Sequence, residues 1–319
     1  MSELLIEARN LTKEFPAGNR KKIHAVSNVS LCLYKGETLA LVGESGCGKS
    51  TLGRLLLRLI PPSSGELFIE GENVTGLSER EFRKYRRYFQ LVFQDPYASL
   101  NPRMTVRDII AEPLKTYHIC SFKEETTKRV LELMEAVEVP AEFLYRYPHQ
   151  FSGGQRQRIG IARAIAIDPS LIVCDEPVSA LDVSVQNQIL NLLKDLQKKR
   201  GIAYLFISHD LSVVRHISDQ VCVMFLGRIC EISSKEEIFR APLHPYTRLL
   251  LNAVPIPDPH RRNDSVQLLT GEPPSPVDPP SGCCFRTRCP YADKKCQKEV
   301  PLPRDINGRE VACHHPLEC

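Results

Sequence analysis

The residue pattern most clearly suited to chemistry is a glycine-rich stretch, Gly43-Glu-Ser-Gly-Cys-Gly-Lys-Ser50, which fits the spacing G-x-x-x-x-G-K-[ST]. It follows an apolar run over residues 38–42, which predicts a strand, and it precedes a predicted helix. Glycines let successive backbone N–H groups converge on phosphate oxygens, and the positive end of the helix favours the same anion. We therefore expect a phosphate-binding loop in which Lys49 reaches the β- and γ-phosphates and Ser50 offers a hydroxyl to Mg²⁺. The predicted nucleotide contacts are Gly43, Glu44, Ser45, Gly46, Cys47, Gly48, Lys49, Ser50 and Thr51.

A second apolar run, Leu171 to Cys174, ends in two adjacent acids. Asp175 is the candidate ligand of the Mg²⁺ shell, and Glu176 is the candidate general base for an attacking water. In isolation, an acidic pair after a strand is commonly just an exposed turn. Together with the phosphate loop, the pair indicates nucleotide hydrolysis.

The segment Ser152-Gly-Gly-Gln-Arg156 precedes this second run and opens another predicted helix. Its hydroxyl and its closely approachable backbone N–H groups offer a second anion site, and Ser152 also suits a helix N-cap; the two roles are compatible. The segment matches the signature of the ATP-binding-cassette (ABC) ATPases, which the chain resembles over roughly residues 4–235. This resemblance makes Ser152, Gly153, Gly154 and Gln155 nucleotide contacts.

The resemblance also implies roles for four residues outside these motifs. Gln94 matches the glutamine loop, with a catalytic role and a contact to Mg²⁺. Asp182 matches the D-loop and His209 the switch histidine that contacts the γ-phosphate. Phe15 is the candidate for stacking on adenine, although a phenylalanine in an N-terminal strand is as often a core residue. The implied cofactors are ATP and Mg²⁺, and the implied fold is an α/β phosphate-loop (P-loop NTPase) core with a helical lobe.

The element pattern agrees with an α/β fold, because short apolar runs such as residues 203–207 alternate with helical stretches. A largely helical region is expected over residues 105–165, within a helical lobe spanning about 95–165. Its clearest helix is predicted to begin at Ser121, with Glu124 completing a capping box. One buried stripe of this helix is predicted at Val130, Leu133, Met134 and Val137.

Composition limits the function classes. The charge balance, 42 − 38 = +4, is too mild for a dedicated nucleic-acid binder. No apolar run approaches the 18 or more residues of a spanning helix, and the N-terminal sequence has no signal-peptide pattern, so we expect a chain on the cytoplasmic side. Of 24 prolines, 14 lie from Pro242 onward, and six of the 12 cysteines lie from Cys283 onward. This shift predicts a cassette over residues 1–240 and an extension over residues 241–319.

Three segments resemble the ATPases of dipeptide and oligopeptide importers. One follows the glutamine loop, Asp95 to Pro102, and two lie in the extension, His244 to Leu251 and Gly271 to Pro276. The resemblance also covers Cys283, Cys289, Cys296 and Cys313, which match the four-cysteine [4Fe–4S] pattern of that subgroup. Four thiolates also suit zinc, but the spacing lacks the C-x₂-C pairs usual for structural zinc. Zinc is the alternative.

The remaining cysteines and the two histidines near the C-terminus differ from these four in the roles that we expect. Cys319, His314 and His315 are not expected to be ligands, whereas Cys284 is an additional thiol next to Cys283 that could be mistaken for one. Cys47 lies in an electropositive loop, which favours a reactive thiolate, with an inert buried thiol as the alternative. Buried positions are the simplest expectation for Cys32, Cys47, Cys120, Cys174, Cys222 and Cys230.

The resemblance implies an ATP-hydrolysing subunit that energises import of di- or oligopeptides. One chain carries one cassette, so a second, homologous ABC ATPase subunit is implied. Two transmembrane permease subunits and an extracytoplasmic substrate-binding protein complete the assembly, with the chain peripheral on the cytoplasmic face of the membrane. Nickel, glutathione or sugar cargo is an alternative. A soluble ABC ATPase acting on nucleic acid or the ribosome is less favoured, because such proteins usually carry two cassettes or long coiled-coil insertions.

Overall fold

The computed structural model describes residues 3–18, 21–253 and 271–318, so Cys319 lies outside the described residues. The chain forms two compact units. The first comprises residues 3–5, 33–37 and 76–207, and the second comprises residues 6–18, 21–32, 38–75, 208–253 and 271–318. Both combine buried strands with helices, which confirms the predicted α/β class.

The first unit holds a parallel three-stranded arrangement in the order β6, β7, β8. Its elements are α2 (Glu79–Arg86), β6 (Phe89–Val92), α3 (Val106–Thr116), α4 (Lys123–Ala136), η1 (Ala141–Phe143), η2 (Pro148–Gln150), α5 (Gly153–Ile165), β7 (Leu171–Asp175), α6 (Val183–Arg200) and β8 (Ala203–Ser208). Strands β7 and β8 are buried almost throughout, as continuous apolar runs in parallel sheets are. The predicted strands at residues 171–174 and 203–207 are confirmed.

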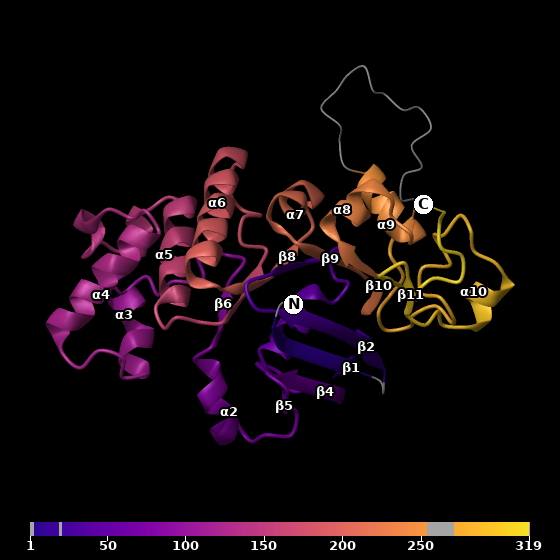
Figure 1. Ribbon diagram of the computed structural model, residues 1–319, viewed down its shortest axis with the longest axis horizontal. Coiled ribbons are helices and arrows are strands. Elements are labelled where there is room, and N and C mark those ends of the chain that lie inside the picture. The colour runs from indigo at the N-terminus through magenta and orange to yellow at the C-terminus, as the bar shows by residue number, and fades with distance from the viewer. Residues whose placement is uncertain (1–2, 19–20, 254–270, 319) are drawn as a thin grey trace, which may run out of the picture. The chain divides into compact units, whose positions relative to one another are not determined.

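Helices α3, α4 and α5 pack against one another and confirm the predicted helical region (Figure 1). The predicted capping box of α4 is wrong. The helix begins at Lys123 with Phe122 as its N-cap, and the Ser121 N–H donates to Glu125 Oε2 at 3.0 Å. Ser121 thus lies one residue too early, and the acid that folds back is not Glu124. The predicted stripe is confirmed as fully buried: Val130, Leu133, Met134 and Val137.

The second unit contains two sheet regions. Its elements are β1 (Leu4–Pro16), β2 (Lys22–Tyr34), β3 (Thr38–Val42), α1 (Lys49–Leu56), β4 (Ser64–Ile69), β5 (Glu72–Asn73), α7 (Leu211–Ile217), β9 (Gln220–Phe225), β10 (Arg228–Ser234), α8 (Lys235–Arg240), α9 (Pro245–Asn252), α10 (Lys294–Lys298), β11 (Arg304–Ile306) and β12 (Arg309–Val311). One region has the order β2-β1-β4-β5, and the other runs β11-β12-β10-β9-β3. The buried strand β3 confirms the strand predicted before the glycine-rich loop, and it pairs in parallel with β9.

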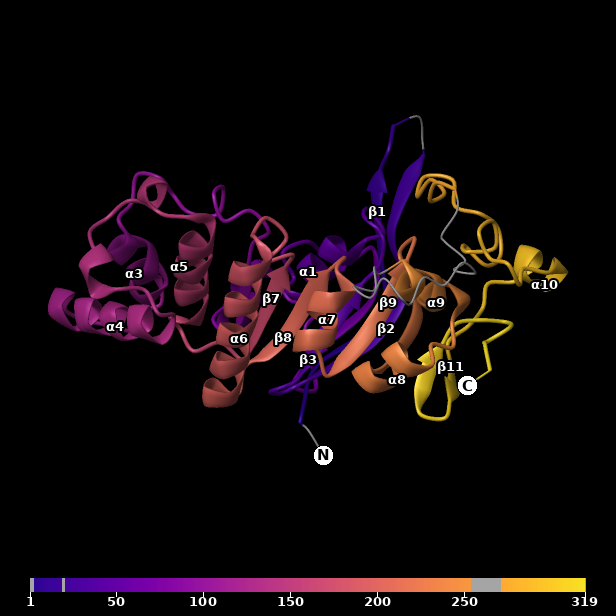
Figure 2. The ribbon, with the colours of Figure 1, turned by 90° about the horizontal axis from the view of Figure 1, so that it is seen from above.

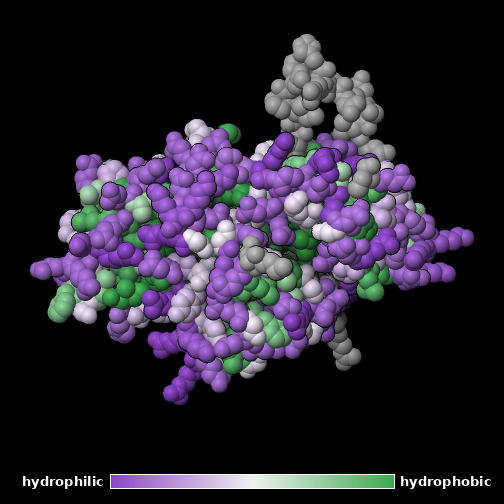
Figure 3. Space-filling view, in the orientation of Figure 1, coloured by the Kyte–Doolittle hydropathy of each residue, from purple (hydrophilic) through white to green (hydrophobic). Residues whose placement is uncertain are grey.

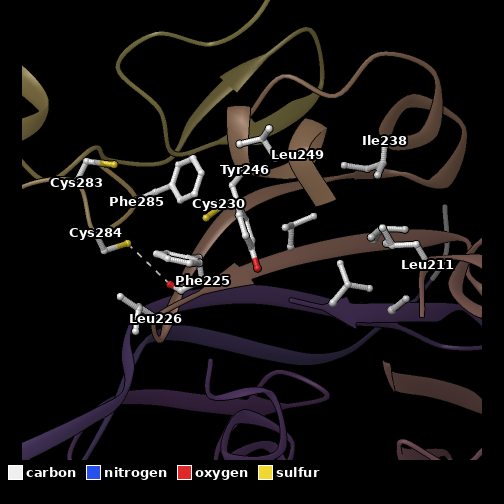
Figure 4. Close-up of a cluster of buried hydrophobic side chains, with 14 of the residues drawn as sticks. Leu211, Phe225, Leu226, Cys230, Ile238, Tyr246, Leu249, Cys283, Cys284 and Phe285 are labelled. Carbon is white, nitrogen blue, oxygen red and sulfur yellow. Dashed lines mark hydrogen bonds between the residues drawn. The ribbon is translucent and has the colours of Figure 1, made fainter. Parts of the chain in front are cut away.

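Residues on both sides of position 240 share one core within this second unit. Helices α8 and α9 contact β10 (Figure 1). Strand β12 pairs with β10 and with β11, and β11 lies beside α8 in Figure 2. Figure 4 shows Phe285 from the cysteine-rich segment beside Tyr246 of α9 and Phe225 of β9, with ring centroids 5.2 and 5.3 Å away. The domain boundary near residue 240 stays a prediction.

Polar residues predominate on the face drawn in Figure 3. Among the described residues, no helix combines the length and apolar character needed to cross a membrane. The expectation of burial fails for Cys32, which is exposed, and for the half-buried Cys120. Leu31 and Leu33 of β2 face inward, so the residue between them faces outward. The other four scattered cysteines are buried as expected: Cys47, Cys174, Cys222 and Cys230.

The aromatic core predicts a stability effect. Phe285→Ala should lower the free energy of unfolding by about 3–5 kcal/mol, because it leaves a cavity among buried rings. Leu302→Ala is the matched control in the same segment; its side chain is 72% exposed, and its effect should stay within about 0.5 kcal/mol. Urea unfolding curves of the full chain measure both. Equal effects would contradict the shared core.

Candidate nucleotide site

The phosphate loop leaves β3 at Gly43 and enters α1 at Lys49. Three of its glycines have positive φ: 152° at Gly43, 76° at Gly46 and 105° at Gly48. A β-carbon would lie 2.1 Å from the Met224 carbonyl oxygen at Gly43, and 2.1 Å from the Ala25 carbonyl oxygen at Gly48. Only glycine fits these two positions. The backbone geometry therefore suits the close approach of a phosphate group.

Lys49 is the first residue of α1, and its side chain is buried. Its ammonium donates to the carbonyl oxygens of Gly43 and Glu44 at 2.8 and 2.9 Å. A cation held against the loop backbone in this way fits a contact with the terminal phosphates of a nucleotide. Ser50 and Thr51 follow in the first turn of α1.

Cys47 does not match the expectation of a reactive thiol. Only 5% of the residue is exposed, and burial raises the pKa of the Cys47 thiol above its ordinary value. The Lys49 ammonium, 3.8 Å from the sulfur, opposes that shift without reversing it. Burial is the part of the alternative that the structure confirms, and the low reactivity of the thiol stays a prediction.

The acidic pair lies at the end of β7. Asp175 is opposite Ile207 of β8, and the Glu176 N–H donates to the Ile207 carbonyl oxygen at 3.0 Å. The Glu176 backbone has a φ of 46°, a left-handed conformation that is uncommon away from glycine. The Gln94 amide donates to Glu176 Oε2 at 2.9 Å. Two predicted catalytic residues, 82 positions apart in the chain, are thus in direct contact.

The signature segment forms the N-terminus of α5. Ser152 is the N-cap, and its capping box with Gln155 has distances of 3.4 and 3.1 Å. A β-carbon at Gly154 would lie 2.4 Å from Val185 Cγ1, so this glycine is required for packing against α6. A β-carbon at Gly153 would likewise lie 3.0 Å from Leu181 Cδ2. The local capping role predicted for Ser152 is confirmed.

Three further candidates take simple structural positions. Asp182 is the N-cap of α6 and accepts from the Val185 N–H at 3.1 Å. His209 is exposed directly after β8. Phe15 is half-buried in β1, and Lys13 Nζ lies 5.1 Å from the centre of its ring. Their nucleotide contacts stay predictions.

The four predicted cluster ligands lie in the second unit. The Cys283 N–H donates to the Cys296 carbonyl oxygen at 2.8 Å, and both residues belong to the buried core against which Cys289 packs. Burial, together with the sulfurs of Cys283, Cys289 and Cys296, raises the pKa of the Cys313 thiol to about 12. The four thiols therefore share one neighbourhood.

His315 lies beside one of these cysteines, and the expectation that it is not a ligand stays a prediction. Its Nε2 is 3.0 Å from Asp293 Oδ2, and the other carboxylate oxygen of Asp293 accepts from the Cys296 N–H at 2.9 Å. These three side chains form a group whose donor atoms lie within 4.8 Å of one another. His314 instead contacts the Glu299 carbonyl oxygen at 3.0 Å.

Two contacts of the phosphate loop were missed by sequence reasoning. Tyr246 Oη accepts from the Glu44 N–H at 3.0 Å, and Arg288 pairs with the Glu44 carboxylate at 2.6 and 3.0 Å. Arg288 is 244 positions from Glu44, and no local pattern reports a pairing over that separation.

The environment of Cys47 leads to a labelling prediction. At pH 7 the native chain should alkylate Cys47 with maleimide about tenfold more slowly than the exposed Cys32, because both the thiolate fraction and access are reduced. Since the thiol pKa is raised, the rate at Cys47 should keep increasing as the pH rises past the ordinary range of a cysteine. Mass spectrometry of digested chain, with urea-unfolded protein as control, measures both sites. Equal alkylation rates at Cys47 and Cys32 in the native chain would contradict this prediction and support a reactive Cys47 thiol.

Comparisons with known proteins agree with this geometry. The sequence profile of the ABC transporter family matches residues 26–179, and the profile described as the oligopeptide/dipeptide transporter C-terminal region matches residues 230–296. The dimeric structure of the ATP-binding cassette MJ0796, bound to ADP and Pi, is 32% identical and has a TM-score of 0.67, covering 72% of this chain and 99% of that one.

Similarity extends along nearly the whole chain. A putative oligopeptide transport ATP-binding protein of Bacillus subtilis, YkfD, is 54% identical, over 97% of this chain and 95% of its own length. The oligopeptide transport ATP-binding protein OppF of Escherichia coli is 52% identical, over 92% of this chain and 88% of its own. At such identity over such coverage, the chain belongs to the ATP-binding proteins of the oligopeptide ABC transporter family.

Proposed function

We propose that the chain is the ATP-hydrolysing subunit of a transporter that imports di- or oligopeptides. The observation that carries the hydrolytic part is the contact between the Gln94 amide and the Glu176 carboxylate, directly after Asp175 at the end of a buried strand. The peptide cargo is supported by the relatives, whose names describe oligopeptide transport.

Binding in this proposal relies on the phosphate loop. The backbone N–H groups between Gly43 and Ser50 and the Lys49 ammonium bind the phosphates of ATP. Ser50, Asp175 and Gln94 are the proposed protein ligands of Mg²⁺, which supplies charge neutralisation at the phosphates when bound. Ser152, Gly153, Gly154, Gln155, Asp182 and His209 are proposed contacts in the assembled transporter, and Phe15 is the proposed adenine contact.

Glu176 is the proposed general base. The Gln94 amide donates to one of its carboxylate oxygens and so sets the direction of the group without adding positive charge. The carboxylate then accepts a proton from the attacking water. The left-handed backbone at Glu176 turns its side chain out of the strand direction that Asp175 follows.

The proposed partners follow from the family. We propose two transmembrane permease subunits, a second homologous ATPase and an extracytoplasmic substrate-binding protein, with this chain peripheral at the cytoplasmic face of the membrane. Relatives named for transport favour this assembly over the alternative of a nucleic-acid or ribosome-associated ATPase.

The test uses the transporter purified with its membrane subunits and reconstituted in vesicles. Glu176→Gln should lower ATP turnover by about 10²–10⁴-fold and abolish uptake of a labelled tripeptide, while ATP binding is retained, because only the base is lost. Lys49→Ala is the contrasting variant, which should weaken ATP binding itself because a direct phosphate contact disappears.

Two results would contradict the proposal. Near-normal ATP turnover by Glu176→Gln would show that another residue is the general base. Wild-type vesicles that take up nickel, glutathione or a sugar but no peptide would refute the peptide cargo and leave the ATPase assignment intact.

We also propose that Cys283, Cys289, Cys296 and Cys313 hold a [4Fe–4S] cluster. Soft thiolate ligands suit such a cluster, and their shared neighbourhood in the second unit supports it. Zinc is the competing ion. The group of Asp293, Cys296 and His315 supplies a mixed ligand set that a single divalent ion would favour.

Anaerobic purification distinguishes the two metals. With the cluster, the protein should be brown and contain iron and sulfide in near-equal amounts, and Cys289→Ser should lose the colour. Zinc would leave the protein colourless, because its filled d shell gives no visible absorption. One zinc with no iron would refute the cluster, and loss of that zinc in His315→Ala but not in Cys289→Ser would assign it to the mixed group.

A further inference from the structure

The phosphate loop contains a carboxylate, Glu44, at a place where the ligand is an anion. Every polar group of this residue has a partner within the second unit. Its N–H donates to Tyr246 Oη at 3.0 Å, its carbonyl oxygen accepts from Lys49 at 2.9 Å, and its carboxylate accepts two hydrogen bonds from Arg288.

The ion pair with Arg288 is well shielded from water. The two guanidinium nitrogens lie 2.6 and 3.0 Å from the two carboxylate oxygens, in the bidentate geometry typical of strong arginine–carboxylate pairs. The Arg288 side chain is 5% exposed and that of Glu44 is 25% exposed. Loss of one partner would leave a charge in a poorly solvated position.

Arg288 is held by the folded C-terminal segment. The preceding Phe285 is 1% exposed and packs against Phe225 and Tyr246, and Cys284 Sγ lies 3.9 Å from the Phe225 carbonyl oxygen (Figure 4). The Arg288 guanidinium carbon lies 5.9 Å from the centre of the Phe225 ring. The packing of Phe285 therefore holds Arg288 next to the phosphate loop.

We propose that Arg288 is a positioning residue of the phosphate loop, which sets the affinity for ATP by neutralising Glu44. Without it, the carboxylate repels the phosphates that the backbone N–H groups and Lys49 attract. This inference rests on the proposed ATP site and gives the C-terminal segment a part in nucleotide binding.

Two roles of Arg288 can be distinguished by the direction in which Glu44→Gln changes the affinity for ATP. In one role Arg288 compensates the charge of Glu44; in the other it only tethers the C-terminal segment to the loop. If Arg288 compensates charge, Arg288→Ala weakens ATP binding by about tenfold, as expected for a like charge within about 10 Å of the phosphates at an effective dielectric constant of about 20. Glu44→Gln keeps an acceptor oxygen for Arg288 but removes the negative charge, so it tightens binding. The double variant recovers most of the loss. Tethering alone predicts that both single variants weaken binding.

The experiment titrates the full 319-residue chain with fluorescent ATP in the absence of Mg²⁺, at low and high salt. Arg286→Ala is the matched control, because this arginine belongs to the same segment but donates to the Ser281 carbonyl oxygen at 2.9 Å. Its ATP affinity should stay within about twofold of the wild type, and the effect of Arg288→Ala should shrink with salt. In steady-state hydrolysis, Arg288→Ala should raise KM for ATP and change kcat little.

Each outcome decides the question. Weaker binding in both single variants, or no rescue in the double variant, overturns charge compensation. If Arg288→Ala does not fold by circular dichroism, Arg288→Lys and Glu44→Gln carry the test: the lysine keeps the charge, so its loss should be only about threefold. A wild-type chain that binds no ATP would instead refute the proposed function.

Discussion

The shape of the phosphate loop depends on two backbone carbonyl groups that leave no room for a β-carbon. The Met224 carbonyl of β9 bounds the loop at Gly43, and the Ala25 carbonyl of β2 bounds it at Gly48. The Gly227 N–H also donates to the Cys47 carbonyl oxygen at 2.8 Å. Because β9 is paired with β3, the strand that leads into the loop, the walls and the entrance of the loop belong to one hydrogen-bonded framework. A phosphate-binding surface so confined needs little reorganisation when a ligand arrives.

The C-terminal segment gains its order from the same framework. Its elements are short, and such a segment buries too little apolar surface to fold independently. Phe285 packs against both Phe225 and Tyr246, and β12 pairs with β10, so the segment shares a core that the rest of the second unit already forms. Because this core holds the segment in place, Arg288 has a defined position beside Glu44 of the phosphate loop.

Sequence patterns predicted those parts of the fold that local chemistry determines. Continuous apolar runs correctly predicted the strands at 38–42 and 171–174, because a strand of this composition is stable only in a sheet that is covered on both faces. The phosphate loop is predictable for a related reason, since its glycine spacing encodes a backbone shape. The start of α4 was misplaced because Ser121 has the right side chain for a cap, but Phe122 takes the capping position.

Properties that depend on distant neighbours were not predictable. The thiol of Cys47 was expected to be reactive from its charged surroundings in sequence, yet burial within the fold dominates. The pair of Arg288 with Glu44 crosses 244 positions. The fold brings His315 to Asp293, a contact that no spacing in the sequence indicates. In each case the deciding fact is a tertiary contact that leaves no periodicity or spacing in the sequence.

Within the first unit, the residues around the proposed base are linked mechanically to α5. The Arg163 guanidinium of α5 donates to the Ser99 carbonyl oxygen at 2.9 Å, and the Arg156 guanidinium lies 3.9 Å from the centre of the Tyr97 ring. Both contacts hold the segment that follows Gln94, whose amide in turn orients Glu176. Two arginine side chains of α5 thus hold residues 97–99 in place, and Gln94 lies shortly before that segment in the chain. The helix that Ser152 caps therefore packs against the segment next to Gln94, the residue whose amide contacts the proposed base.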